Sequence, residues 1–249
     1  MAQERWRLLP EESRVSGGGP AAMTTFLELV NKVGRESGTI SQQQELTTLA
    51  NVAGRQRRIA DWTADAWKTI QRMRNDWTFR RAQFSAALIT GQMRYTAAEL
   101  AIADFGRWPG HADRWSRWSI YDPAVGKGDE IRLPPIRHED WVNQFDMGVH
   151  DAQRPGSVSV GFDKALYVGP SPDKVYTLRG WYMREIQTLT ADDDEPYISE
   201  EFHDAIVWRA LMTLGEDDEA PFEVASSTGQ FREFYGAMVK EFTPPIELT

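Results

Sequence analysis

Helical and strand-like hydrophobic patterns occupy separate stretches of this chain, and that separation restricts its fold class more than any other feature. In residues 55–77, apolar side chains recur every three or four positions while charged side chains fill the other faces. The stripe consists of Ile59, Trp62, Ala66, Ile70, Met73 and Trp77. It predicts an amphipathic helix, which depends for its stability on packing its apolar side against another element.

Further helices are predicted toward both ends of the chain. Thr25 and Glu28 have the spacing of a capping box, which predicts a helix over 25–35, followed by a loop with one helical turn near 41–44. Toward the C-terminus, Phe202, Ile206, Ala210 and Leu214 form a second stripe, widened by Val207 and Leu211. A last helix is expected over about 222–242. Its apolar residues are Phe231, Phe234, Tyr235, Met238 and Phe242, and Pro244 and Pro245 end it.

Between residues 80 and 190 the pattern changes to short apolar runs broken by Gly and Pro, which is typical of strands and turns. Strands are predicted at 86–89, 118–121 and 175–186, a hairpin joins 157–162 to 165–170, and a short helix covers 138–145. The sequence therefore predicts an α+β fold, in which a helical bundle formed by the N- and C-terminal helices flanks a β-rich region.

This pattern divides the chain into consecutive segments. We expect a flexible arm over 1–22, the N-terminal helices of the bundle over 23–79, the β-rich region over 80–190, the C-terminal helices over 191–242, and an extended tail over 243–249. Because a helix start follows Met23 directly, we hypothesise that Met23 is the natural first residue.

Charge and composition narrow the function classes. The chain carries a net charge of -9, but residues 1–118 hold 17 Lys and Arg against 12 Asp and Glu, whereas residues 119–249 hold 11 against 25. An acidic total argues against tight duplex binding, which depends on neutralising phosphates, and suits a conduit through which DNA slides. There is no cysteine, no apolar run long enough for a membrane span and no signal peptide. We expect a protein that is made soluble and is not exported.

No pattern for catalysis stands out. His111, His138, His150 and His203 are widely separated, and a helix-packing role is the expected one for His203. The acidic run 192–195 either ligates a hard cation or offsets the dipole of the helix after it, and run 216–219 repeats the pattern before the last helix. Motifs for nucleophiles and phosphate loops are missing, and the sequence does not single out a carboxylate pair. No catalytic residue, metal or cofactor is predicted.

One segment alternates arginine and tryptophan. Its members are Arg107, Trp108, Arg114, Trp115, Arg117 and Trp118. Such a composition is typical of association hot spots, and we favour a subunit interface here. Two other interpretations stay open, which are plain core packing and a platform for nucleic acid or glycan.

The order of these elements resembles the head-to-tail adaptor, or head-completion, proteins of tailed bacteriophages. The matching patterns lie scattered through residues 24–215. They are TTFLELV at 24–30, RIADWTADAW at 58–67, DW at 76–77, YVGPSP at 167–172, YTLRGWY at 176–182, LTADDDEP at 189–196 and FHDAIVWRAL at 202–211. Each is weak alone, and their combination in this order carries the resemblance.

The resemblance implies a structural virion protein and no enzymatic activity. It implies a homo-oligomeric ring, usually of twelve copies, that docks beneath the portal protein and joins it to a tail-side neck or tail protein. Double-stranded DNA would pass through the channel without sequence-specific binding, and no membrane would be involved. The protein would be made in the host cytoplasm and reside in the neck of the virion.

The resemblance also implies that the C-terminal segment reaches into the portal. The candidate portal-binding residues are Phe242, Pro244, Pro245, Ile246 and Leu248. A frayed terminus is the alternative interpretation of this tail. Two other functions stay open for the whole chain, which are another structural tail protein, such as a terminator or baseplate component, and a phage-encoded glycan or cell-wall hydrolase.

Overall fold

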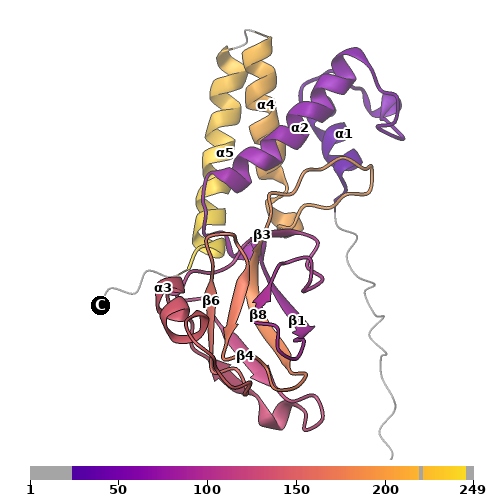
Figure 1. The fold of residues 1–249 in the computed structure, drawn as a ribbon. Helices are drawn as coiled ribbons and strands as arrows, with labels where there is room; N and C mark the ends of the chain where they lie inside the picture. Colours follow the sequence, from indigo (N-terminus) through magenta and orange to yellow (C-terminus); the bar gives the residue numbers. More distant parts are fainter. Residues whose placement is uncertain (1–23, 219–220, 245–249) are drawn as a thin grey trace, which may run out of the picture.

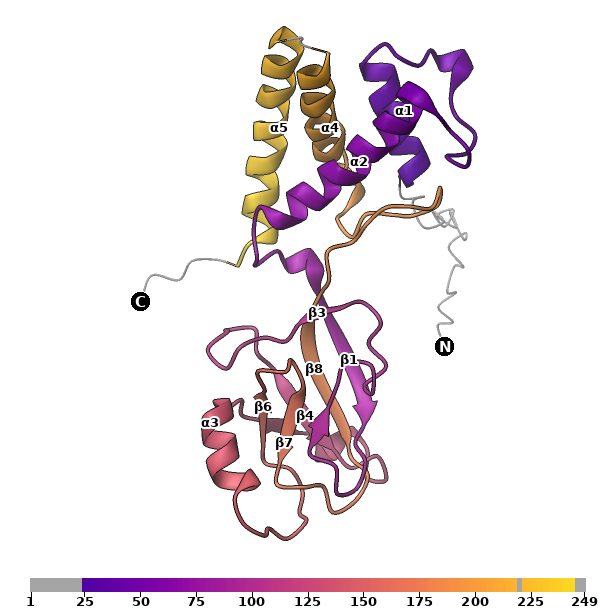
Figure 2. The same ribbon diagram turned by 45° about the horizontal axis from the view of Figure 1, so that its top comes forward.

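The computed structural model describes residues 24–218 and 221–244, which form a helical module and a β module (Figures 1 and 2). The predicted arm over 1–22, Met23, Pro245, Ile246 and Leu248 lie outside the described residues. The helical module contains α1 (Phe26–Glu36), η1 (Gln42–Gln44), α2 (Gly54–Arg72), η2 (Thr78–Arg80), η5 (Glu200–Phe202), α4 (Asp204–Asp217) and α5 (Pro221–Phe242).

The β module comes from the middle of the chain. It contains β1 (Arg81–Ala87), β2 (Arg94–Tyr95), β3 (Phe105–Arg107), β4 (Trp118–Tyr121), η3 (Lys127–Asp129), β5 (Ile131–Leu133), α3 (His138–Trp141), η4 (Val142–Asp146), β6 (Ser157–Val160), β7 (Leu166–Gly169) and β8 (Thr177–Arg184). The predicted α+β class is confirmed, with helices from both ends of the chain beside a β-rich middle.

The start of α1 shows how local and distant residues together define a helix end. The predicted capping box is present, since the Thr25 hydroxyl accepts a hydrogen bond from the Glu28 N–H and the Glu28 carboxylate accepts one from the Thr25 N–H. Two further N–H groups of the first turn, of Phe26 and Leu27, donate to the carbonyls of Asp194 and Asp192 at 2.8 and 3.1 Å. The free N–H groups of this turn are thereby satisfied.

Two roles were predicted for the acidic run 192–195, which were to hold a cation or to offset the dipole of the following helix. The second prediction is wrong, because the following helix, α4, begins only at Asp204. The run lies instead at the start of α1. The Asp192 carboxylate accepts hydrogen bonds from the Thr48 hydroxyl at 2.6 Å and the Leu49 N–H at 2.8 Å. The Asp194 carboxylate accepts from the Thr190 and Ala191 N–H groups, so both side chains fix loops rather than a helix dipole.

These hydrogen bonds make Asp192 a source of acid sensitivity. The Thr48 hydroxyl, followed by the Leu49 N–H, lowers the pKa of the Asp192 carboxyl. Because the pKa of Asp192 is lower in the folded state, its carboxylate stabilises the fold at pH values above its unfolded pKa of about 4. This contribution to stability is lost as the pH falls through the folded-state pKa. Asp192→Asn should therefore have a lower melting temperature than the parent at pH 7, and the difference should shrink toward pH 3.

Thermal melts followed by circular dichroism across this pH range test the prediction. Asp193→Asn is the matched control because Asp193 is exposed and takes part in no hydrogen bond recorded in the described residues. A constant difference between Asp192→Asn and the parent over the whole range would contradict it.

Helix α2 ends at Arg72, earlier than the apolar stripe predicts. Met73 is 40% exposed, so the stripe loses its burial there. Trp77 is nonetheless fully buried, because the turn after α2 folds it back so that its Nε1 donates to the Ile70 carbonyl at 3.0 Å. Its ring stacks on Phe79 with a centroid distance of 5.3 Å. The helical spacing to Trp77 was therefore coincidental, although its burial was real.

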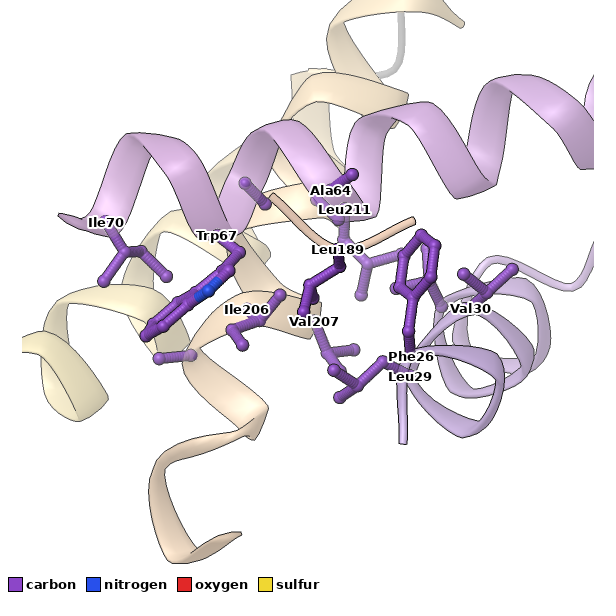
Figure 3. Packing of buried hydrophobic residues seen from close by; sticks show 14 of the residues in the cluster. Phe26, Leu29, Val30, Ala64, Trp67, Ile70, Leu189, Ile206, Val207 and Leu211 are labelled. Atoms are coloured by element: carbon purple, nitrogen blue, oxygen red, sulfur yellow. The ribbon is translucent and has the colours of Figure 1, made fainter. Parts of the chain in front are cut away.

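The core of the helical module joins both ends of the chain (Figure 3). α1 supplies Phe26, Leu29 and Val30, α2 supplies Ala64, Trp67 and Ile70, and α4 supplies Ile206, Val207 and Leu211. Phe231 and Met238 of α5 close the cluster, as their predicted stripe requires. Packing of the terminal helices against each other is thus confirmed. α1, α2 and α5 each contact α4 (Figure 1).

The β module is a sandwich of two antiparallel sheets. The large sheet has the order β1-β8-β4-β5, with β3 also paired to β8, and the small sheet has the order β2-β7-β6. The strand predicted at 118–121, the strand within 175–186 and the hairpin β6–β7 are confirmed. Inner residues of both sheets share one core, which includes Trp118, Ile120, Val158 and Leu166.

The predicted short helix at 138–145 is confirmed as α3 and η4, and it covers the outer face of the small sheet. Trp141 lies 4.9 Å from the Tyr167 ring, measured between centroids. Phe145 lies so close to Gly169 that a Cβ added there would be 2.4 Å from the Phe145 ring. Along the layers, the order is therefore α3, small sheet and large sheet (Figure 2).

None of the helices in residues 24–218 and 221–244 is long and apolar enough to span a membrane.

Candidate interaction surfaces

The structure divides the predicted Trp/Arg interface segment into buried and exposed members. Trp108 and Trp118 are 4% and 2% exposed, and both belong to the core of the β module. The Trp108 Nε1 donates to the Lys164 carbonyl at 2.9 Å, and the Trp118 Nε1 donates to the Ser116 hydroxyl at 3.0 Å. For these two tryptophans the core-packing interpretation holds, because a fully packed side chain has no surface left for a neighbouring subunit.

Trp115 is different, because it is only half-buried between two arginines. The guanidinium carbons of Arg81 and Arg107 lie 5.0 and 5.5 Å from the centre of its ring. Arg107 also pairs with Asp113 at 3.3 Å and donates to the Asn75 carbonyl, which lies after α2. This cation–π stack therefore holds the exposed loop near the junction of the two modules.

The two remaining arginines of the segment, Arg114 and Arg117, line a groove of about 640 Å³ on the outer face of the large sheet. Cross-strand pairing sets its floor, where Arg179 of β8 faces Ser119 of β4, and Ser119 faces Arg132 of β5. Sequence reasoning did not connect Arg132 and Arg179 with this segment. Only the register of β4, β5 and β8 brings these two arginines to the segment. Strand register joins residues far apart in the sequence, so local patterns do not reveal it.

Glu130 is the carboxylate of this groove. It accepts a hydrogen bond from the Ser119 hydroxyl at 2.5 Å and pairs with Arg179 at 2.9 Å. The Ser119 hydroxyl, together with Arg179, lowers the pKa of Glu130, so the carboxylate is ionised and neutralises Arg179. Neither Arg117 nor Arg132 has an ionic partner within the described part of the chain. The groove therefore presents unneutralised positive charge.

The predicted portal-binding residues are also separated. The Phe242 ring packs edge-on against Phe79 and Phe202, at centroid distances of 5.4 and 5.1 Å, and belongs to the helical core. Phe242 therefore lies in the packed last helix, as the helix predicted over 222–242 has it, and its part in portal binding stays a prediction. Pro244 is exposed. Among the described candidates, one is thus packed in the helical core and one is exposed.

The histidines and carboxylates of the described residues do not form a metal site. Among residues 24–218 and 221–244, no three His, Asp or Glu side chains lie close enough to hold a metal ion. His111 and His150 are exposed, and the half-buried His138 ring stacks on Trp141. His203 has the predicted packing role, since its Nε2 lies 3.0 Å from the Ile198 carbonyl and burial lowers its pKa.

The second acidic run, at 216–219, takes part in ion pairs. Asp217 and Asp218 pair with Arg55 at the start of α2, and Asp217 also pairs with Arg58. The end of α4 is thereby tied to the first turn of α2. The described carboxylates of this run thus join two helices of the bundle.

Comparison with known families decides the class of protein. The family model of the SU10 adaptor protein matches residues 24–243, which include both modules. The chain belongs to the SU10 adaptor protein family. This is a family of structural phage proteins and not of enzymes, and membership implies a component of the virion. Among curated proteins, none matches the chain.

Family membership also indicates which features of this SU10 adaptor are relevant to its function, namely its exposed surfaces. A structural subunit of a virion functions through contacts with other chains, so its exposed grooves and charged faces are candidate contact surfaces. In the described residues of this adaptor, the sequence-predicted contact positions that remain accessible are Arg107, Arg114, Arg117, the half-buried Trp115, and Pro244 after α5.

Proposed function

We propose that this adaptor forms a ring of twelve copies that docks beneath the portal protein and connects it to a tail-side neck or tail protein around the DNA channel. The match of the SU10 adaptor model to residues 24–243 carries this proposal, because it includes the helical and the β module in one unit. The net charge of -9 is consistent with DNA that slides past without being held, since tight duplex binding needs Lys and Arg on phosphates.

The proposed docking segment is the tail that follows α5, beginning at Pro244. A Pro-stiffened extended peptide loses little conformational entropy when it binds in a groove. The Phe242 ring holds the base of this segment on the helical module through Phe79 and Phe202. The portal contact would therefore be made by residues 244–249, with Phe242 as their anchor.

Capture by an immobilised portal ring tests the proposal. The full chain should be captured, and negative-stain images of the complex should show twelvefold symmetry. A chain that ends at Thr243 should lose at least tenfold in capture, while its circular dichroism and melting temperature stay unchanged because Phe242 is retained.

The control is a chain without residues 1–22, which lie outside the family match and should be captured as the full chain is. Equal capture of the chain ending at Thr243 would refute the tail contact. Sixfold or threefold particles would favour a tail terminator or a baseplate component over an adaptor.

A further inference from the structure

The β module has two outer faces, and only one of them is covered. α3 and η4 lie on the outer face of the small sheet, whereas none of the helices in the described residues covers the outer face of the large sheet (Figure 2). On that open face, Ser85, Arg179, Ser119 and Arg132 form a row across strands β1, β8, β4 and β5. The row is continuous, because each residue is paired directly with the next.

The open face of the large sheet is basic. Its groove is lined by four arginines and one carboxylate. They are Arg114, Arg117, Arg132, Arg179 and Glu130. We call this surface the basic face. In a chain whose net charge is -9, such a local excess of positive charge indicates a surface that meets negative charge.

The covered side of the module is acidic. From Arg137 to Asp151, the chain has one arginine and four carboxylates, a net charge of -3 with neutral histidines. The four are Glu139, Asp140, Asp146 and Asp151, and all of them are exposed. We call this surface the acidic face. Exposed apolar side chains lie among these charges, since Met147 is 63% and Val149 is 100% exposed.

The two faces lie on opposite sides of the sandwich. The inner surfaces of both sheets share one core, so the basic face of the large sheet and α3 on the small sheet point away from each other. His138 and Trp141 fix α3 on Tyr167, with centroid distances of 4.7 and 4.9 Å. A surface complementary to its own opposite side makes a head-to-tail contact, which closes into a ring when the rotation between copies allows it.

We propose that the basic face of one copy binds the acidic face of the next copy, and that this contact repeats around the ring. The inference rests on the proposed function and adds the two surfaces that join neighbouring subunits. The occupant is a second copy because the two faces carry charges of opposite sign. Arg117 and Arg132 would gain their carboxylate partners from the neighbour, with Met147 and Val149 supplying apolar contact at the edge.

Charge reversal with complementation tests the contact. Arg117→Glu/Arg132→Glu makes the basic face acidic, and Asp146→Arg/Asp151→Arg makes the acidic face basic. All four positions are exposed, so each variant should fold with the parent's circular dichroism. Alone, each double variant should lose at least tenfold in the yield of complete rings on the portal, measured by native mass spectrometry.

Two rescues make the test specific. The chain that carries all four substitutions should regain homotypic rings, because its two faces are again opposite in sign. An equimolar mixture of the two double variants should also assemble, with the variants alternating, which an even ring of twelve permits. The matched control is Arg72→Glu/Arg232→Glu, which changes the net charge equally at exposed positions of the helical module and should assemble as the parent does.

Four outcomes would overturn the inference. Formation of rings by both double variants would contradict this inference but not the proposed function. Loss of assembly that the fourfold variant does not restore would have the same meaning. Binding of short duplex DNA that disappears in Arg117→Glu/Arg132→Glu, with ring yield unchanged, would assign the basic face to phosphates instead. Absence of rings from the parent protein would contradict the proposed function itself, and this inference with it.

Discussion

Replacement of Trp118 by alanine is expected to lower the free energy of unfolding of the β module by about 4 kcal/mol. The side chain is 2% exposed, and its ring packs against Phe84 and Trp108 at centroid distances of 6.1 and 5.6 Å. Its Nε1 donates a hydrogen bond to the buried Ser116 hydroxyl, which would lose that partner. Urea denaturation followed by tryptophan fluorescence measures the change.

Trp115→Ala is the matched control, three residues away in the same segment. Trp115 is half-buried and stacks on Arg81 and Arg107, so its removal should cost about 1 kcal/mol or less. Equal losses for Trp115 and Trp118 would contradict the division of this segment into core and surface. If both variants kept the parent's stability, the assignment of Trp118 to the core would be contradicted.

The same pair of residues shows what the sequence could and could not predict. The short apolar run at 118–121 predicts a strand, which the structure confirms, and the structure places the buried Trp118 and Ile120 on one side of it. Whether that side is a core depends on Gly180 across the sheet. A Cβ at Gly180 would lie 2.3 Å from the Trp118 ring, so this glycine makes the space that the indole fills. That pairing joins residues 62 positions apart, which local patterns do not reveal.

Helices were predictable because their signals are local. The capping box at Thr25 and the stripe of α2 lie within a few residues of the groups they satisfy or pack against. The end of α2 was missed because Trp77 continues the spacing although it is buried by a turn. Likewise, the carbonyls of Asp192 and Asp194 reach α1 from the far end of the chain, which no spacing rule includes.

The motifs that carry the family resemblance report the fold more than the contact surfaces. Trp67 in the 58–67 pattern and Leu211 in the 202–211 pattern are buried in the helical core. Arg117 and Arg132 of the basic face lie outside every matching pattern. A resemblance based on core positions therefore predicts that the chain folds as an adaptor. The residues that we propose to join copies are identified only from the arrangement of the sheets.

The fragment 78–188 is expected to fold on its own into the β module. All strands from β1 to β8, α3 and the entire second core lie between Arg81 and Arg184. The helical core, by contrast, draws on both ends of the chain and shares no buried residue with it. The polypeptide crosses between the modules only through η2 and the segment after β8, where Arg80 donates to the Arg184 carbonyl within the fragment itself.

A well-dispersed amide spectrum and a single cooperative urea transition would verify this, because a contiguous segment with its own core behaves as a domain. A fragment that starts at Gly91 is the control. It lacks β1, whose seven residues all pair with β8, so Phe84 and Ala82 no longer cover the core and the fragment should be unfolded.

An unfolded spectrum for 78–188 would mean that the helical module supplies part of the stability, most directly through Trp67 and Gln71, which both hydrogen-bond Gln187. In that case the two modules would be mechanically coupled, and the proposed docking of the segment after α5 on the portal would alter the basic and acidic faces.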